Sequence, residues 1–233
     1  GIVGLPNVGK STLFNALTKS GIAAENYPFC TIEPNIGIVE VPDARMQALA
    51  DIGKPQRMQY ATTEFVDIAG LVAGASKGEG LGNQFLATIR ETDGIVNVVR
   101  CFEDDNVVHV AGKVDPISDI ATIVTELARA VLTAVEKAQE RNVKLVRSGD
   151  KDAAKLGELL VQVAACLNEG KPARSLYLDP AQRALLKPLC LLTMKPVMYV
   201  ANVAEKGFSN NPLLTRVEEY AAHEGAPVVA ICA

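Results

Sequence analysis

The 233-residue chain lacks the features that would indicate membrane, disulfide or zinc chemistry. No apolar run approaches the ~20 residues that a membrane span requires, and we expect no signal peptide. The five cysteines are scattered without a C-x-x-C pair, and the only two histidines, His109 and His223, are far apart. A zinc site needs closely spaced ligand pairs, so we expect none. Free thiols in a reducing cytoplasm fit the cysteines best.

The chain also has no excess of positive charge. Its formal net charge is −4, which provides no general attraction to nucleic acid. An apolar content of 48% and a charged content of 21% are those of an ordinary globular protein. The sequence opens on Gly1 without a methionine and stops at Ala233 directly after an apolar run. We therefore expect a fragment, or the ordered part, of a longer protein.

A complete Walker A motif stands near the start of the chain, as Gly4-Leu-Pro-Asn-Val-Gly9-Lys10-Ser11. An apolar segment precedes it and a helical pattern follows it, which is the context that the motif requires. The two glycines allow a compact loop whose N–H groups point at the phosphates, and the new helix adds the positive end of its dipole. We expect Lys10 to reach the β- and γ-phosphates and the Ser11 hydroxyl to bind Mg²⁺. The motif predicts a nucleoside triphosphate site.

Apolar runs and helical patterns alternate through the first and last parts of the chain. The runs have the composition of buried parallel strands and lie at Gly1–Val3, Thr63–Ile68, Gly94–Arg100, Val197–Ala201 and Val228–Cys232. Helices are predicted at Lys10–Lys19, Gly82–Glu91 and Leu213–Glu224. With a P-loop after the first strand, this order predicts an α/β fold with a doubly wound, mainly parallel sheet. Its ligand should lie at the carboxyl edge of the strands.

The pattern changes between Lys113 and Pro188. Apolar residues recur there at spacings of three and four, on both sides of a break at 148–150. They are Ile117, Ile120, Val124, Leu127, Val131, Ala134 and Ala138 before the break, and Leu156, Leu160, Val163 and Leu167 after it. Two such stripes predict an antiparallel coiled-coil hairpin, whose first helix would reach roughly 45 Å. The hairpin is either a solvated arm or a protrusion that contacts a large partner such as RNA or the ribosome.

Further residues lie at the distances from the Walker A motif that are typical of the switch segments of nucleotide-dependent regulators. Asp67-Ile-Ala-Gly70 ends the second apolar run, where the aspartate can hold Mg²⁺ through water and the glycine N–H can sense the γ-phosphate. Thr31 lies where a switch provides a second hydroxyl for Mg²⁺. Leu71 stands where Ras-like enzymes place a glutamine that orients water. Because leucine cannot polarise water, we expect slow hydrolysis that needs a partner, or another side chain in that role.

The residues after the Val197–Ala201 strand bear on which base is bound. GTPases use N-K-x-D there, and its aspartate accepts hydrogen bonds from guanine, whereas this chain has Asn202-Val-Ala-Glu205. Valine replaces the lysine, and the longer glutamate misplaces the paired acceptor for guanine. Asn202 could pair instead with the N6/N7 edge of adenine, or merely brace the P-loop. We expect ATP to be preferred to GTP.

These segments together resemble a known family. Gly-Leu-Pro-Asn-Val-Gly-Lys-Ser-Thr at 4–12, Asn-Tyr-Pro-Phe-Cys-Thr-Ile-Glu-Pro-Asn at 26–35, the glycine-rich stretch at 67–86 and Asn-Val-Ala-Glu at 202–205 are similar to the motifs of the Obg-like YchF ATPases. The resemblance implies a G-domain fold with a coiled-coil insertion, ATP and Mg²⁺ as ligands, a cytoplasmic location, and association with ribosomal subunits. It also implies a C-terminal TGS domain, which this chain lacks. A monomer with no membrane contact is favoured.

The resemblance also assigns residues. It places the phosphate loop on Asn7, Val8, Gly9, Lys10, Ser11 and Thr12, and a backbone contact with adenine on Val203. The positions argued above add Gly70, Asn202 and Glu205 to the expected nucleotide site. The Mg²⁺ ligands fall on Ser11 and Thr31, together with Asp67. A histidine among valines is by itself more often a packed residue, but the resemblance makes His109 the substitute for the missing glutamine, acting with Lys10. It further suggests Asn7 as a K⁺ ligand.

The expected organisation is a G domain in two parts, 1–112 and 190–233, with a helical coiled-coil insertion at 113–189. The leading function is an ATP-hydrolysing regulatory switch that associates with the ribosome. Two alternatives remain. One is a GTP-dependent factor for translation, ribosome assembly or nucleic-acid binding. The other is a nucleotide-gated binding module in which turnover is incidental.

Overall fold

The computed structural model describes residues 1–19, 35–68, 87–104, 109 and 112–233. Its strands are Ile2–Val3 (β1), Ile36–Glu40 (β2), Thr62–Val66 (β3), Ile95–Arg100 (β4), Val197–Asn202 (β5) and Val228–Ile231 (β6). Its α-helices are Lys10–Lys19 (α1), Ala44–Gly53 (α2), Pro116–Arg147 (α4), Lys151–Asn168 (α5), Pro180–Leu186 (α6) and Pro212–Glu224 (α7). Residues 87–91 are helical as well. Within these ranges, no helix combines the length and apolar character needed to cross a membrane.

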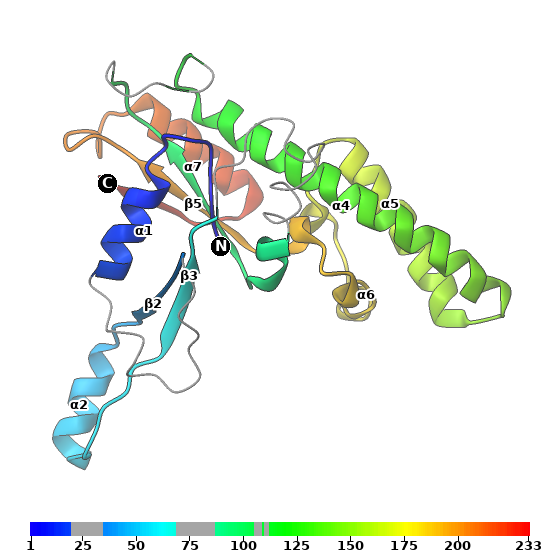
Figure 1. Cartoon of the computed structure of the whole chain (residues 1–233), viewed down its shortest axis with the longest axis horizontal. Coiled ribbons are helices and arrows are strands. Elements are labelled where there is room, and N and C mark those ends of the chain that lie inside the picture. The colour runs from blue at the N-terminus through cyan, green and yellow to red at the C-terminus, as the bar shows by residue number, and fades with distance from the viewer. Residues whose placement is uncertain (20–34, 69–86, 105–108, 110–111) are drawn as a thin grey trace.

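The strands form a mainly parallel sheet, as the sequence predicts (Figure 1). β1, β4, β5 and β6 are neighbours in that order and all pair in parallel. β2 and β3 form an antiparallel pair, and a parallel bridge between Ile2 and Asp67 places the end of β3 beside β1. All five predicted strands are present, and four of them pair in parallel as expected. The prediction of a buried parallel strand at Thr63–Ile68 is wrong, because β3 pairs antiparallel with β2 in the projecting segment and is largely exposed. β2 and α2 were not predicted. Gly37 breaks the apolar pattern in the sequence of β2, and α2 has no buried residue that would mark an apolar stripe.

The two faces of the sheet are covered by separate buried clusters. Successive residues of a strand point to opposite faces, so Val98 belongs to one cluster and Val99 to the other. Residues of α1 pack against the first cluster, and α7 packs in the second. α4 contributes to both, with Ile123 in the first cluster and Ile120 in the second. The core around the sheet therefore includes the first turns of α4.

The predicted helical hairpin is confirmed, and it occupies the connection between β4 and β5. α4 and α5 lie side by side and run in opposite directions, joined by a short turn at 148–150 (Figure 1). Asp115 and Asp150 accept backbone N–H bonds at the starts of the two helices and so cap them. Leu160 and Val163 of α5 belong to the same buried cluster as the residues of β1. The root of the hairpin is thus continuous with the core under the sheet.

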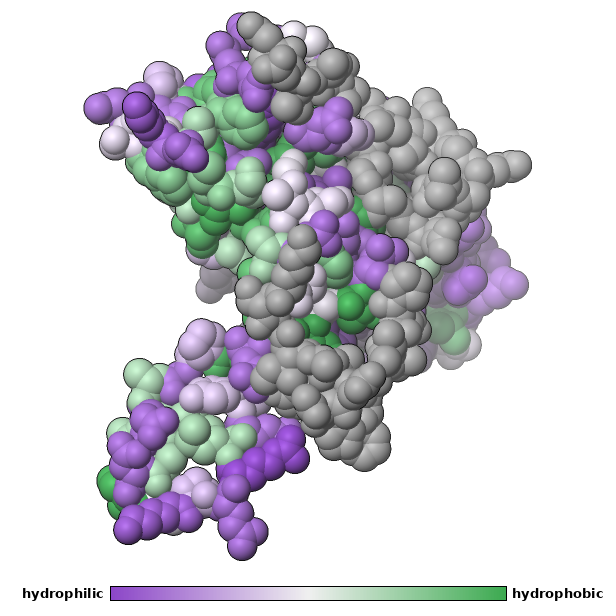
Figure 2. Space-filling model, turned by 60° about the vertical axis from the view of Figure 1, so that its left-hand side comes forward, coloured by the Kyte–Doolittle hydropathy of each residue, from purple (hydrophilic) through white to green (hydrophobic). Residues whose placement is uncertain are grey.

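The hairpin of β2 and β3 with α2 projects away from the rest of the described chain (Figure 2). α2 begins at an Asp43 cap and ends at Lys54, which has a left-handed backbone. None of its residues is buried, and Leu49 and Ile52 are 64% and 83% exposed. Helix propensity and capping, rather than packing, therefore define this helix.

Leu160→Ala tests whether the hairpin root and the sheet form one cooperative unit. Leu160 is fully buried, so we expect a loss of about 2–5 kcal/mol in the free energy of unfolding. The adjacent Val161 is 62% exposed, and Val161→Ala should change this quantity by less than about 0.5 kcal/mol. Urea denaturation followed by circular dichroism measures both. Separate unfolding of the helices and the strands in two transitions would contradict a shared core.

Candidate nucleotide-binding site

The P-loop is the connection between β1 and α1. Leu5 and Val8 are 5% and 1% exposed, so the loop is anchored in the core from below. Asn7 and Gly9 have positive φ angles of 64° and 98°, which turn the chain sharply. A Cβ at Gly9 would collide with the side chain of Asn202, so this position requires glycine. The turn leads into the N-terminus of α1, where free N–H groups and the helix dipole favour an anion.

Lys10 begins α1, and the residue is only 8% exposed. Burial lowers the pKa of Lys10, and the neighbouring Asp67 carboxylate opposes this decrease. A buried ammonium group needs anionic partners, because it has lost its hydration. Phosphate oxygens bound on the P-loop would supply such partners. The charge and burial of Lys10 therefore suit its predicted role at the phosphates.

Ser11 and Asp67 meet at the carboxyl edge of the sheet. The Ser11 hydroxyl donates a hydrogen bond to Asp67 Oδ2 at 3.1 Å. The other carboxylate oxygen, Oδ1, is buried and has no hydrogen-bond partner among the described residues. The backbone N–H of Asp67 donates to the Asn35 carbonyl at 2.9 Å, which fixes the end of β3. A hydroxyl beside a carboxylate with an unsatisfied oxygen is a donor set that fits Mg²⁺.

The structure says less about four other predicted site residues. Thr31 and Gly70 lie outside the described residues. Thr12 is exposed on the first turn of α1. Asn7 stands in the P-loop, and its role as a K⁺ ligand stays a prediction.

Asn202 ties the P-loop to the last residue of the chain. Its Nδ2 donates to the Val8 carbonyl at 3.0 Å, and its Oδ1 accepts the backbone N–H of Ala233 at 3.1 Å. The residue is 2% exposed. Pairing with the N6/N7 edge of adenine would require both amide atoms and an open approach. The structure uses the Asn202 amide to brace the P-loop, which is one of the two roles expected for it. Its pairing with adenine stays a prediction and would require these two bonds to open.

Val203 and Glu205 follow at the positions where a guanine site has lysine and aspartate. Val203 is 1% exposed, and its N–H donates to the Ile231 carbonyl at 2.8 Å. A backbone contact from Val203 to a base would therefore have to use its carbonyl oxygen. Glu205 is exposed in the turn after β5. Both nucleotide contacts stay predictions.

His109 lies buried beside the start of α4. Its Nε2 is 3.0 Å from Asp119 Oδ2, and each side chain is 4% exposed. Burial raises the pKa of Asp119, and the hydrogen bond with His109 opposes this increase. The Nε2 of this imidazole is engaged by Asp119, and the ring is enclosed rather than open to water. The catalytic role of His109 stays a prediction, and it requires a different position of the ring.

The sequence did not single out Asp119. An acid in the first turn of a helix is also typical of an interaction with the helix dipole. The signal that was available is its place in the apolar stripe of α4, next to the fully buried Ile120. A carboxylate in such a stripe needs a partner.

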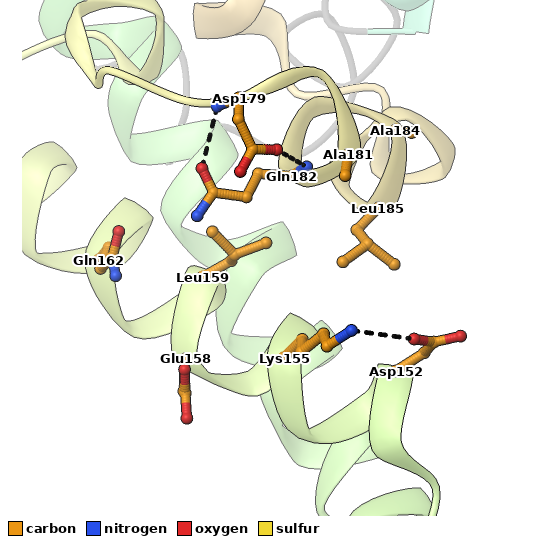
Figure 3. Close-up of a pocket in the computed structure, with 10 residues that line it drawn as sticks. All are labelled: Asp152, Lys155, Glu158, Leu159, Gln162, Asp179, Ala181, Gln182, Ala184 and Leu185. Atoms are coloured by element: carbon orange, nitrogen blue, oxygen red, sulfur yellow. Dashed lines mark hydrogen bonds and ion pairs between the residues drawn. The ribbon is translucent and has the colours of Figure 1, made fainter.

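A cavity of about 550 Å³ lies between α5 and α6 (Figure 3). It is lined by Asp152, Lys155, Glu158, Leu159, Gln162, Asp179, Ala181, Gln182, Ala184 and Leu185. Three of its charged side chains interact with one another or with the backbone: Lys155 lies 3.9 Å from Asp152, and Asp179 accepts the N–H of Gln182 to cap α6. None of the predicted nucleotide residues lines it. The nucleotide site is therefore assigned to the P-loop edge of the sheet.

The sheet order and the P-loop define a P-loop NTPase with a G-domain fold. A family model described as "50S ribosome-binding GTPase" matches residues 1–143. The chain is 60% identical to the ribosome-binding ATPase YchF of Haemophilus influenzae over 233 residues, and 53% identical to that of Bacillus subtilis over 236. These two matches cover 100% of this chain and 64% of the length of each relative. The YchF GTPase structure from Schizosaccharomyces pombe is similar over the whole chain and 64% of its own length, with a TM-score of 0.83 and 37% identity. The chain belongs to the YchF family.

Asn202→Ala tests the bracing role. Removing the amide leaves the Val8 carbonyl and the Ala233 N–H without this partner. The P-loop backbone is then held less firmly, which weakens the binding of ATP and GTP alike. We expect ATP and GTP affinities to fall by a similar factor of about ten, which corresponds to about 1.4 kcal/mol. Calorimetric titration with both Mg²⁺-nucleotides measures this.

Asn142→Ala is the matched control for this experiment. Asn142 is also buried and donates to a backbone carbonyl, that of Ala153, but it lies in the helical hairpin. The control should lose stability and keep its nucleotide affinity. A loss of ATP binding alone in Asn202→Ala would favour the adenine-pairing role.

Proposed function

We propose that this chain is the nucleotide-binding part of a Mg²⁺-dependent nucleoside triphosphatase that prefers ATP to GTP and acts as a ribosome-associated regulatory switch. The observation that carries the proposal is the contact between the Ser11 hydroxyl and Asp67 beside the buried Lys10. Residues 1–112 and 190–233 would form the G domain, with 113–189 as its helical insertion. The Haemophilus influenzae and Bacillus subtilis relatives are named ribosome-binding ATPases, which supports the partner. A cytoplasmic location is in keeping with free Cys101 and Cys166.

The described residues suit phosphoryl transfer, which depends on positioning and charge stabilisation more than on covalent chemistry. The N–H groups of the P-loop and of the first turn of α1 bind phosphate oxygens. The Lys10 ammonium group stabilises charge on the γ-phosphoryl group. Ser11 and Asp67 would hold Mg²⁺, which would supply neutralisation of charge on the phosphates when bound with the nucleotide.

Turnover should be slow without a partner. Leu71 stands where a water-orienting glutamine would be, and its side chain has no polar group. His109 is the side chain that we propose in its place, and it is enclosed beside Asp119. Hydrolysis at a useful rate therefore depends on an event that repositions His109. Binding to the ribosome is the event that would make the protein a switch.

The preference for ATP rests on Val203 and Glu205. Guanine presents two adjacent N–H donors, which an aspartate satisfies as a pair, and the glutamate side chain is one methylene longer. A donor left unsatisfied costs about 1–3 kcal/mol, which is enough to decide between two purines. The alternative is a GTP-dependent factor, and this alternative is favoured by the Schizosaccharomyces pombe relative, which is called a GTPase.

Asp67→Asn tests the metal site. Asparagine keeps the shape and can still accept the Ser11 hydroxyl, but it loses the negative charge that Mg²⁺ requires. We expect Mg²⁺-dependent ATP hydrolysis in the presence of ribosomes to fall by about tenfold or more, while ATP binding in EDTA stays the same. Phosphate release and calorimetry measure the two quantities.

The control is Asp93→Asn. Asp93 is exposed and lies before β4, at the opposite end of that strand from the P-loop edge. This variant should behave as the wild type. Hydrolysis at the wild-type rate in Asp67→Asn would remove Asp67 from the metal site.

Glu205→Asp, alone and combined with Val203→Lys, tests base selection. Shortening the side chain places both carboxylate oxygens where guanine donors need them, so the ratio of the GTP to the ATP dissociation constant should fall by about tenfold. Competition binding with fluorescent nucleotides measures the ratio. Glu205→Gln, which removes the charge without shortening the chain, should not favour GTP. Wild-type protein that binds GTP tenfold more tightly than ATP would refute the ATP preference.

A further inference from the structure

The His109–Asp119 pair has a geometry that the chemistry above leaves unused. His109 lies on the connection after β4, and Asp119 lies in the first turn of α4. Nε2 and Oδ2 are 3.0 Å apart, and both side chains are 4% exposed. We propose that Asp119 is a positioning residue that stores His109 beside α4 and releases it when the hairpin shifts. This inference rests on the proposed function, in which His109 takes the place of the missing glutamine.

Asp119 is itself held firmly. Its backbone N–H donates to the Asp115 carbonyl at 3.0 Å, within the capped first turn of α4. The next residue, Ile120, is fully buried. Burial, followed by the charge of Asp119, raises the pKa of the Cys101 thiol to about 12. His109 Nε2, 3.0 Å away, is the side-chain group that shares a hydrogen bond with the Asp119 carboxyl.

The connection that carries His109 begins after Arg100, which is held as firmly as Asp119. Arg100, at the end of β4, is 1% exposed. Its guanidinium group donates to the carbonyls of Phe102 and Asp104 at 3.0 and 3.1 Å and lies over the Phe102 ring. One end of the connection is therefore anchored to the sheet. The other, through Asp119, is anchored to α4.

The contact is suited to being broken. Desolvation of two buried groups offsets much of their attraction, so such a pair adds little net stability although its geometry is good. Its partners lie on different elements, and α4, which is 32 residues long, runs from Asp119 to a tip where Leu145 is 52% exposed. Because α4 is one continuous helix, a partner that bound this tip and shifted the helix would change the distance between His109 and Asp119.

The first experiment measures where His109 is, without any enzymatic activity. The whole chain is labelled with diethyl pyrocarbonate, and His223, which is exposed, serves as the internal reference. We expect His109 to react at least about tenfold more slowly than His223 in the wild type, because the imidazole is enclosed. Asp119→Asn should increase the rate at His109 several-fold and leave His223 unchanged. Equal rates at the two histidines in the wild type would overturn the storage role, even if the variant does not fold.

Asp115→Asn is the matched control. Asp115 lies one turn earlier, caps α4 and pairs with Arg216 at 3.2 Å, and asparagine is an equally good cap. This variant should keep His109 protected. Exposure of His109 by this control as well would assign the protection to the helix start in general, and so overturn the specific role of Asp119.

The second experiment asks whether release matters for turnover. Asp119→Asn should raise the kcat of Mg²⁺-ATP hydrolysis without ribosomes by at least threefold, with KM unchanged, and the increase should vanish when His109→Ala is added. A merely structural Asp119 would lower stability and leave kcat the same or lower. An increase that persists without His109 would overturn the proposal. If neither protein hydrolyses ATP while the labelling changes as expected, the storage contact is supported and the hydrolytic function is refuted.

Discussion

The buried amide of Asn202 joins the P-loop to the end of β5 and to the residue that closes the chain after β6. Asn202 at the end of β5 holds the Val8 carbonyl, 194 residues away in sequence, and the N–H of Ala233, which follows β6. The bond to Val8 is buried, which makes it stronger and makes its loss more costly, and the bond to Ala233 is partly buried. The shape of the P-loop therefore depends on the late strands as well as on the Walker A residues. A motif of eight residues does not form this site unless the far half of the sheet is in place.

The helices and strands that the sequence predicted are those whose burial leaves an apolar pattern in consecutive residues. β4 and β5 are apolar runs because both of their faces are covered, and α4 repeats apolar residues at helical spacing because one side faces the core. α2 has no such side, since none of its residues is buried. β2 contains Gly37 within a short pattern. Hydrophobic periodicity reports burial, so it does not reveal a helix or strand that buries few of its residues.

The residues of the candidate site also divide into those that the sequence predicted and those that it did not. Lys10, Ser11 and Asp67 were predicted because the motif and the strand end determine their positions. The bracing role of Asn202 could only be weighed as an alternative, because its partners are backbone atoms that any residue type can provide. The partner of His109 was missed for a related reason. Asp119 reaches it across a connection whose path no periodicity encodes.

The position of the helical hairpin between β4 and β5 has a consequence for how the chain folds. The two strands pair side by side although residues 101–196 separate them, and closing a long loop costs entropy before any strand contact forms. α4 and α5 make mainly local contacts, so they can assemble early and return the chain close to its starting point. Early assembly shortens the effective distance that β5 has to search. A chain whose hairpin forms late should therefore reach its native sheet slowly, even where its final stability is unchanged.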